Sequence, residues 1–111
     1  MEIKRADINQ IEKTYLTMFG LASLEETSID NGNKLFVKLI DDFRSGDLSV
    51  DQLSSFGFEL FHKVGKRNEG SDLFNASLSA SELTFALRSS ATFSNIQGYL
   101  EDIEDFYNKY K

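Results

Sequence analysis

Two runs of apolar residues at helical spacing flank a turn signal in residues 35–64, and this stretch constrains the fold most strongly. The runs are Leu35, Phe36, Leu39, Ile40 and Phe43, and then Leu53, Phe56, Leu60, Phe61 and Val64. Gly46 follows the first run, where a left-handed cap residue is favoured. Ser49 precedes Gln52 by three residues, which is the spacing of a capping box. The stretch therefore predicts an antiparallel helical hairpin, with Gly65 ending its second helix.

Further helices are predicted on both sides of the hairpin. They cover about residues 7–20, 80–90 and 95–110, each with apolar residues at helical spacing. Asp7 and Asp30 are the expected N-caps of the first two helices, and Met18 is expected in the core. Ser79 and Glu82 have the spacing of a second capping box.

Turn-forming residues separate the last three predicted helices. Residues 66–77 are rich in Gly, Asn, Ser and Asp and are expected to form a loop. Ser89, Ser90, Thr92 and Ser94 weaken helical propensity and are expected to bend or break the chain. The sequence thus predicts an all-α fold, a small antiparallel helical bundle of four to five helices in one domain spanning residues 1–111.

Composition excludes several classes of site and partner. The chain has no Cys, so disulfides and thiolate metal sites are excluded, and it has no Pro, which fits uninterrupted helices. Its formal net charge is −6, so phosphate repulsion argues against direct nucleic-acid binding and a basic protein partner is favoured. No apolar run has the length of a signal peptide core or a membrane span. We therefore expect a cytoplasmic protein with no membrane partner.

Catalytic motifs are scarce. His62 is the only histidine, and neither a P-loop nor a GxGxxG motif is present. A Ser–His–acid triad remains open, although no nucleophile-elbow pattern accompanies the serines. The pairs Asp41–Asp42 and Glu101–Asp102 are adjacent, and adjacent helical residues point about 100° apart, so neither is a ready-made acid–base dyad. We expect a protein that is not an enzyme and that needs no cofactor.

The hairpin turn can also be aligned with a calcium loop. Residues 41–52 place Asp41 and Gly46 at the first and sixth positions of an EF-hand loop. Phe43 and Gln52, however, occupy the third and twelfth positions, which require oxygen ligands and a bidentate Glu. A C-cap glycine and a capping box account for the same letters, so no metal site is predicted.

Carboxylates are concentrated on the last predicted helix. Glu101 and Asp105 are four residues apart and Asp102 and Asp105 three apart, and such like-charge pairs cost an isolated helix about 0.2–0.5 kcal/mol each. They form either a solvated face, with Lys109 four residues after Asp105, or a binding surface. Phe58 points away from the main apolar face of its helix and is either a second core layer or an exposed anchor. The candidate partner-binding residues are Phe58, Glu59, Glu69, Asp72, Glu101, Asp102 and Asp105.

Residues 35–64 resemble the first hairpin of small bacterial immunity proteins of the colicin D and contact-dependent inhibition kind. The residues that carry the resemblance are Phe43, Gly46, Leu48, Ser49, Leu53 and Phe56. The chain differs from the family in an extra helix before the hairpin, and the residues after Gly65 are not matched. The resemblance implies a helical bundle that binds and neutralises a cognate toxin nuclease, often a tRNA-cleaving one. A helical adaptor or regulatory protein with another partner is the alternative.

Overall fold

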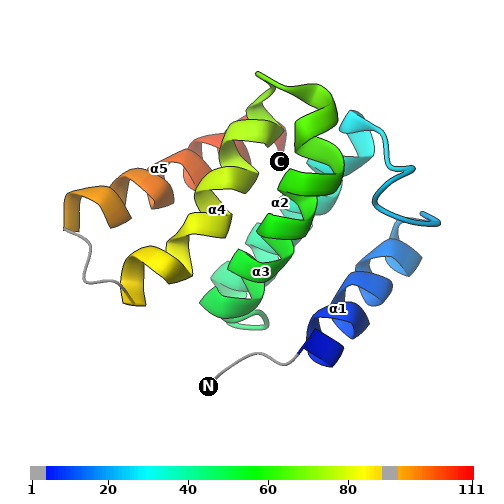
Figure 1. Ribbon diagram of the computed structural model, residues 1–111, viewed down its shortest axis with the longest axis horizontal. Coiled ribbons are helices and arrows are strands. Elements are labelled where there is room, and N and C mark those ends of the chain that lie inside the picture. Colours follow the sequence, from blue (N-terminus) through cyan, green and yellow to red (C-terminus); the bar gives the residue numbers. More distant parts are fainter. Residues whose placement is uncertain (1–4, 89–92) are drawn as a thin grey trace.

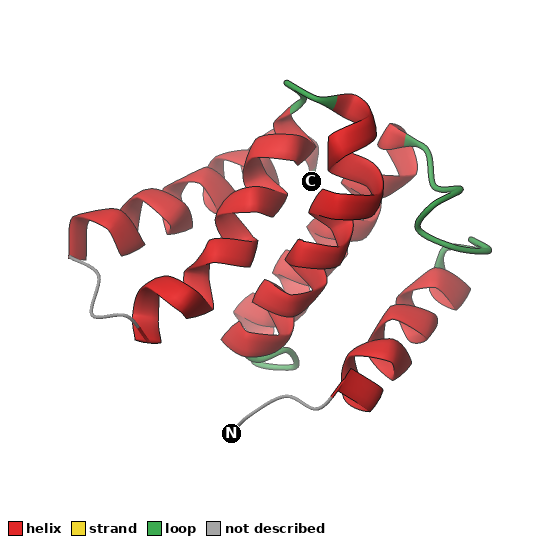
Figure 2. Ribbon diagram, viewed as in Figure 1, coloured by secondary structure: helices red, strands yellow, loops and turns green. Residues whose placement is uncertain are grey.

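The computed structural model describes residues 5–88 and 93–111, and in these ranges every regular element is helical (Figures 1 and 2). The α-helices are α1 (Arg5–Met18), α2 (Ile29–Ser45), α3 (Val50–Leu60), α4 (Asp72–Arg88) and α5 (Phe93–Tyr110). The prediction of an all-α bundle is confirmed. None of the described helices has the length and apolar character needed to cross a bilayer.

Helices α3, α4 and α5 form a layer with α4 in the middle, and α2 packs against all three. Helix α1 lies outside α3, on the side away from α4 (Figure 1). The core between these helices is rich in leucine and phenylalanine, including Leu35, Phe36, Leu39, Leu53, Phe56, Leu60, Leu73, Leu83, Ile103 and Phe106. The layer therefore has an inner face against α2 and an outer face open to solvent.

The hairpin between α2 and α3 forms as its caps predict. Gly46 has φ +89°, in the left-handed region, and its N–H donates to the carbonyls of Asp42 and Phe43. The Ser49 hydroxyl accepts from the Gln52 N–H at 3.1 Å, and the Gln52 side chain accepts from the Ser49 N–H at 2.8 Å. Phe43 packs against the core, which leaves it unsuited to a calcium loop.

Gly65 does not end the second helix of the hairpin. After α3 the chain continues through a π-helical turn, Phe61–Gly65, and a 3-10 turn, Lys66–Asn68. Gly65 has helical backbone angles and is buried, and a Cβ atom there would lie 3.3 Å from the Phe74 Cα atom. The glycine thus permits close approach of α4, and the chain reverses only at Gly70, where φ is +84°.

Helix α4 begins earlier than the sequence pattern predicts. Ser71 accepts a hydrogen bond from the Phe74 N–H at 3.1 Å, so it caps α4. Much of the predicted loop, from Asp72 onward, is therefore helical. The second capping box is wrong, because Ser79 lies inside α4 and its hydroxyl donates to Asp102 of α5 at 2.8 Å. Ser79 therefore contributes to a contact between two helices, and the local spacing of residues does not reveal such a contact.

Three predictions at the ends of the first two helices are also wrong. Asp7 lies inside α1 and does not cap it. Ser28 caps α2 by accepting from the Asn31 N–H at 3.2 Å, and Asp30 lies in the first turn, where a carboxylate suits the helix dipole. Met18 is 55% exposed because Tyr15 and Leu16 supply the buried face of α1.

Helix α5 begins at Phe93, close to its predicted start. The predicted break falls partly on residues 89–92, which lie outside the described residues, whereas Ser94 belongs to α5.

Candidate partner-binding surface

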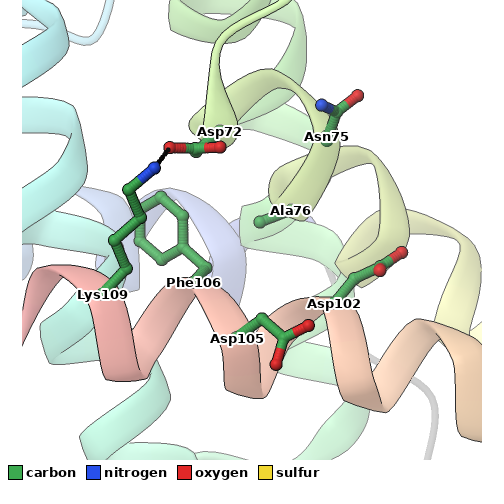
Figure 3. A pocket seen from close by; sticks show the side chains of 7 residues that line it. All are labelled: Asp72, Asn75, Ala76, Asp102, Asp105, Phe106 and Lys109. Carbon is green, nitrogen blue, oxygen red and sulfur yellow. Dashed lines mark hydrogen bonds and ion pairs between the residues drawn. The ribbon is translucent and has the colours of Figure 1, made fainter.

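A groove of about 220 Å³ lies between the first turns of α4 and the C-terminal half of α5 (Figure 3). Its lining residues are Asp72, Asn75 and Ala76 from α4 and Asp102, Asp105, Phe106 and Lys109 from α5. Three of the carboxylates singled out by the sequence pattern, Asp72, Asp102 and Asp105, therefore line one groove. The antiparallel packing of α4 against α5 brings them together although they are distant in sequence.

The carboxylates are positioned by local structure in both helices. Ser71 caps α4 and so places Asp72 in the first helical turn. The Ser79 hydroxyl donates to Asp102 across the seam between the helices. Phe106 is only 3% exposed and lies between the polar side chains, where it anchors α5 to the core. The groove is therefore built on packed helices and not on a loop.

Lys109 pairs with Asp72 and not with Asp105, which is four residues away on α5. Its ammonium lies 2.7 Å from the Asp72 carboxylate (Figure 3). The same carboxylate accepts from the Tyr110 hydroxyl at 2.7 Å. These two hydrogen bonds, from Lys109 first, hold the pKa of Asp72 below its usual range, and the pKa of Lys109 is raised. Among the described residues, no cation lies within ion-pair distance of Asp102 or Asp105. Their negative charges remain available at the surface.

Three other predicted residues lie apart from this groove. Glu101 is exposed on α5 and accepts from the Gln97 side chain at 3.2 Å, and Glu69 is exposed before α4. Glu59 on α3 pairs with Lys63 at 3.1 Å. The same ammonium lies 3.7 Å from Glu12 and 3.4 Å from Glu25, so this acidic cluster ties α1 and the α1–α2 connection to the end of α3.

Phe58 is an exposed residue and not part of a second core layer. It is 51% exposed, and its ring lies 4.2 Å from the ring of His62, which is also exposed. Phe61 is the other ring against His62, at 5.2 Å. His62 thus lies among exposed and half-buried aromatic rings on the outer side of α3.

The adjacent acids Asp41 and Asp42 accept hydrogen bonds from different helices. Asp41 accepts from the Tyr107 hydroxyl of α5 at 2.5 Å. Asp42 accepts from the Tyr15 hydroxyl of α1 and pairs with Lys38 at 3.0 Å. They do not form a dyad. No group of three or more His, Asp or Glu suited to a metal ion occurs in residues 5–88 and 93–111.

Sequence reasoning missed the outer residues of α4. Phe85 is 69% exposed, and Leu78 is half-buried on the same side of the helix. Their helical spacing was visible, but the helix was expected to start at residue 80, so the face they share with Phe74 could not be recognised.

No protein family model matches the sequence, and neither a curated protein nor a solved structure matches it.

Proposed function

We propose that the protein is a non-catalytic immunity protein that binds and neutralises a cognate bacterial toxin nuclease, such as a tRNA-cleaving one. One observation carries the proposal. Asp102 and Asp105 are held on a packed helix beside a groove, and within the described chain no cation pairs with them. The hairpin that resembles the family also forms with its predicted caps.

The charge arrangement suits an inhibitor of a nuclease. A nuclease presents a cationic surface to the phosphates of its substrate, and an acidic protein surface can occupy it as a charge mimic. A net charge of −6 also favours fast encounter with such a partner by electrostatic steering. Lys109 pairs with Asp72 of α4, and no cation in the described residues pairs with the four acids Glu101, Asp102, Glu104 and Asp105 of α5.

Growth protection tests this function directly. The test requires a candidate toxin nuclease domain encoded next to this chain's gene. It is expressed with and without the chain, and the purified proteins are mixed with the nuclease substrate. We expect the chain to restore growth and to block cleavage at stoichiometric amounts. Arrest that persists in the presence of folded chain would contradict the proposal, and it would favour a helical adaptor with another partner.

A matched pair of variants separates the groove from overall charge. Asp102→Asn with Asp105→Asn removes two charges at the groove, and Glu26→Gln with Asp47→Asn removes two exposed charges elsewhere. We expect only the first pair to weaken protection. Asn can still accept the hydrogen bond from Ser79, so the fold should be retained.

A further inference from the structure

We infer that the outer face of the α3–α4–α5 layer is a docking surface for a cationic amphipathic helix of the partner. The inference rests on the proposed function and names the surface and the partner element that would meet on it. The surface combines the acidic groove with a neighbouring row of apolar side chains. We call this row the outer apolar strip; it consists of Phe58, Phe74, Leu78 and Phe85.

The strip crosses the seam between α3 and α4. Three contacts fix the antiparallel register: the Thr84 hydroxyl donates to Asp51 at 2.9 Å, the Ser54 hydroxyl donates to the Ser81 carbonyl at 3.0 Å, and the rings of Phe61 and Phe74 lie 5.1 Å apart. In this register Phe58 lies level with Leu78 on the neighbouring helix. Both residues stand opposite the buried faces of their helices, so they project outward.

Small residues fill the seam itself. A Cβ atom at Gly57 would lie 2.8 Å from the Ala80 Cβ atom and 3.3 Å from the Ser77 carbonyl oxygen. The two helices therefore pack closely through glycine, alanine and serine, and the large side chains stay on the outside. Phe58 and Phe85 are 51% and 69% exposed, so neither is needed to fill the core. Exposed apolar side chains gathered on one face are typical of an interaction surface.

The acidic groove borders the strip on the α5 side. Along α4, Glu82 and Asn75 separate it from the groove, where Asp102 and Asp105 face solvent from α5. On the α3 side the neighbours are His62 and Lys66 near the Phe74 end and Asp51 near the Phe85 end. The Lys66 ammonium lies 5.6 Å from the Phe61 ring. An occupant with an apolar stripe and cations on one flank would complement both parts.

The dimensions suit a helix. From Phe74 to Phe85 the strip runs about 16 Å along α4, at 1.5 Å per residue, which is about three helical turns. An amphipathic helix lying along it would present apolar residues at i, i+4 and i+7 to the strip and its Lys or Arg residues to Asp102 and Asp105. A second copy of this chain is a poorer occupant, because each copy carries a net charge of −6.

A synthetic helix tests the surface without the toxin. The probe is a labelled amphipathic peptide of Leu and Lys with the lysines on one flank, and its affinity is measured by fluorescence anisotropy. We expect Phe58→Ala and Phe85→Ala each to raise Kd about tenfold, as for exposed aromatic anchors. Met18→Ala is the matched control, because Met18 is 55% exposed on α1, away from the strip. It should leave Kd unchanged.

Charge variants test the acidic border with the same peptide. Asp102→Asn with Asp105→Asn should weaken binding and flatten its salt dependence, whereas Glu26→Gln with Asp47→Asn should alter neither as much. Unfolding midpoints should match that of the unaltered protein, because the substituted side chains are exposed.

Four outcomes would overturn the inference, three with purified components and one in the growth test. Equal loss of affinity in the Met18 and Phe85 variants would show non-specific adsorption, and unchanged affinity in the Phe58 and Phe85 variants would remove the strip from binding. Self-association of the unaltered chain that Phe85→Ala abolishes, measured by sedimentation equilibrium, would assign the face to a second copy. The growth test remains separate: full protection by the Phe58 and Phe85 variants would refute the strip and leave the proposed function standing.

Discussion

Gly46 and Gly98 allow the same substitution to be compared at two kinds of backbone position. Gly46 has φ +89°, where a side chain is strained, while Gly98 lies within α5 and a Cβ atom there would meet nothing within 4 Å. Gly46→Ala should lower the free energy of unfolding by about 1 kcal/mol. Gly98→Ala should raise it by about 0.5–1 kcal/mol, because Ala restricts the unfolded chain and favours a helix. Urea unfolding of the two variants measures both changes.

Changes of the same sign in the two glycine variants would contradict the assignment of Gly46 as the left-handed cap. Gly46→Asn is a useful third variant, since Asn tolerates the left-handed region better than Ala does. The free energy of unfolding of Gly46→Asn should lie between that of the unaltered protein and that of Gly46→Ala.

At the scale of elements, α1 depends on a few specific contacts. The ring of Tyr15 packs edge-on against Phe56 of α3 at 5.6 Å, and its hydroxyl donates to Asp42 of α2. Burial and then the hydrogen bond to Asp42 raise the pKa of Tyr15 above its usual value of about 10. The folded state therefore keeps this phenol protonated at a pH where the unfolded chain ionises it.

The Tyr15 contact predicts a loss of stability in alkali. The pKa of Tyr15 is higher in the folded state than in the unfolded chain. The contribution of Tyr15 to the free energy of unfolding is therefore complete below about pH 10, and it falls as the pH rises from there toward the folded-state pKa. Tyr15→Phe should be less stable near pH 8 but lose less stability above about pH 10. Urea unfolding at several pH values gives the two curves, and parallel curves would contradict the assigned role. Tyr107→Phe should show the same trend, because the hydrogen bond from its hydroxyl to Asp41 also raises the pKa of Tyr107.

Elements were predictable where their signals are local, and less so where helices meet. The α2–α3 hairpin is set by Gly46, Ser49 and Gln52, all within one turn, and it forms as predicted. Ser79 has the same local spacing to an acid, but its hydroxyl serves a contact with α5. Gly65 likewise looks like a stop, although the close approach of α4 is what requires it. Tertiary packing decided both cases.

The candidate site also contains residues that local sequence signals predict and contacts that they do not predict. The charge pattern alone singled out Asp102 and Asp105, because periodicity on α5 is strong. Their meeting with Asp72 depends on the register of α4 against α5, which no local pattern contains. Sequence reasoning found only Phe58 of the outer apolar strip. Phe74 and Leu78 lie in the first two turns of α4, and these turns were not predicted because the helix is capped by Ser71 and not by Ser79.

On the scale of the whole molecule, the cations are distributed unevenly among the acids. Lys63 lies among Glu12, Glu25 and Glu59, Lys38 pairs with Asp42, and Lys109 pairs with Asp72. Acids elsewhere are thus partly neutralised within the fold, while Asp102 and Asp105 on α5 remain without an ion-pair partner among the described residues. Glu101, Asp102, Glu104 and Asp105 thus place four acids within five residues of α5, and no described cation pairs with them.

Association with a basic partner should depend on salt through α5. The Debye length falls from about 10 Å at 0.1 M salt to about 3 Å at 1 M, so the association rate should fall over this range. Replacing Glu101, Asp102 and Asp105 by Gln, Asn and Asn should lower the rate at low salt, by on the order of tenfold, and flatten its salt dependence. Stopped-flow mixing with the nuclease domain measures both.

The control for this triple variant removes three charges from residues outside α5. Glu25 is unsuitable because it pairs with Lys63, so the control replaces Glu26, Asp30 and Asp47, which are exposed. Both variants have the same net charge, and the control should lose about 0.3–1 kcal/mol of stability because Asp30 lies in the first turn of α2. Equal slowing by the two variants would show that net charge alone steers the encounter. If neither variant slows association, electrostatic steering fails as an explanation, and only the outer apolar strip would remain as the basis of recognition.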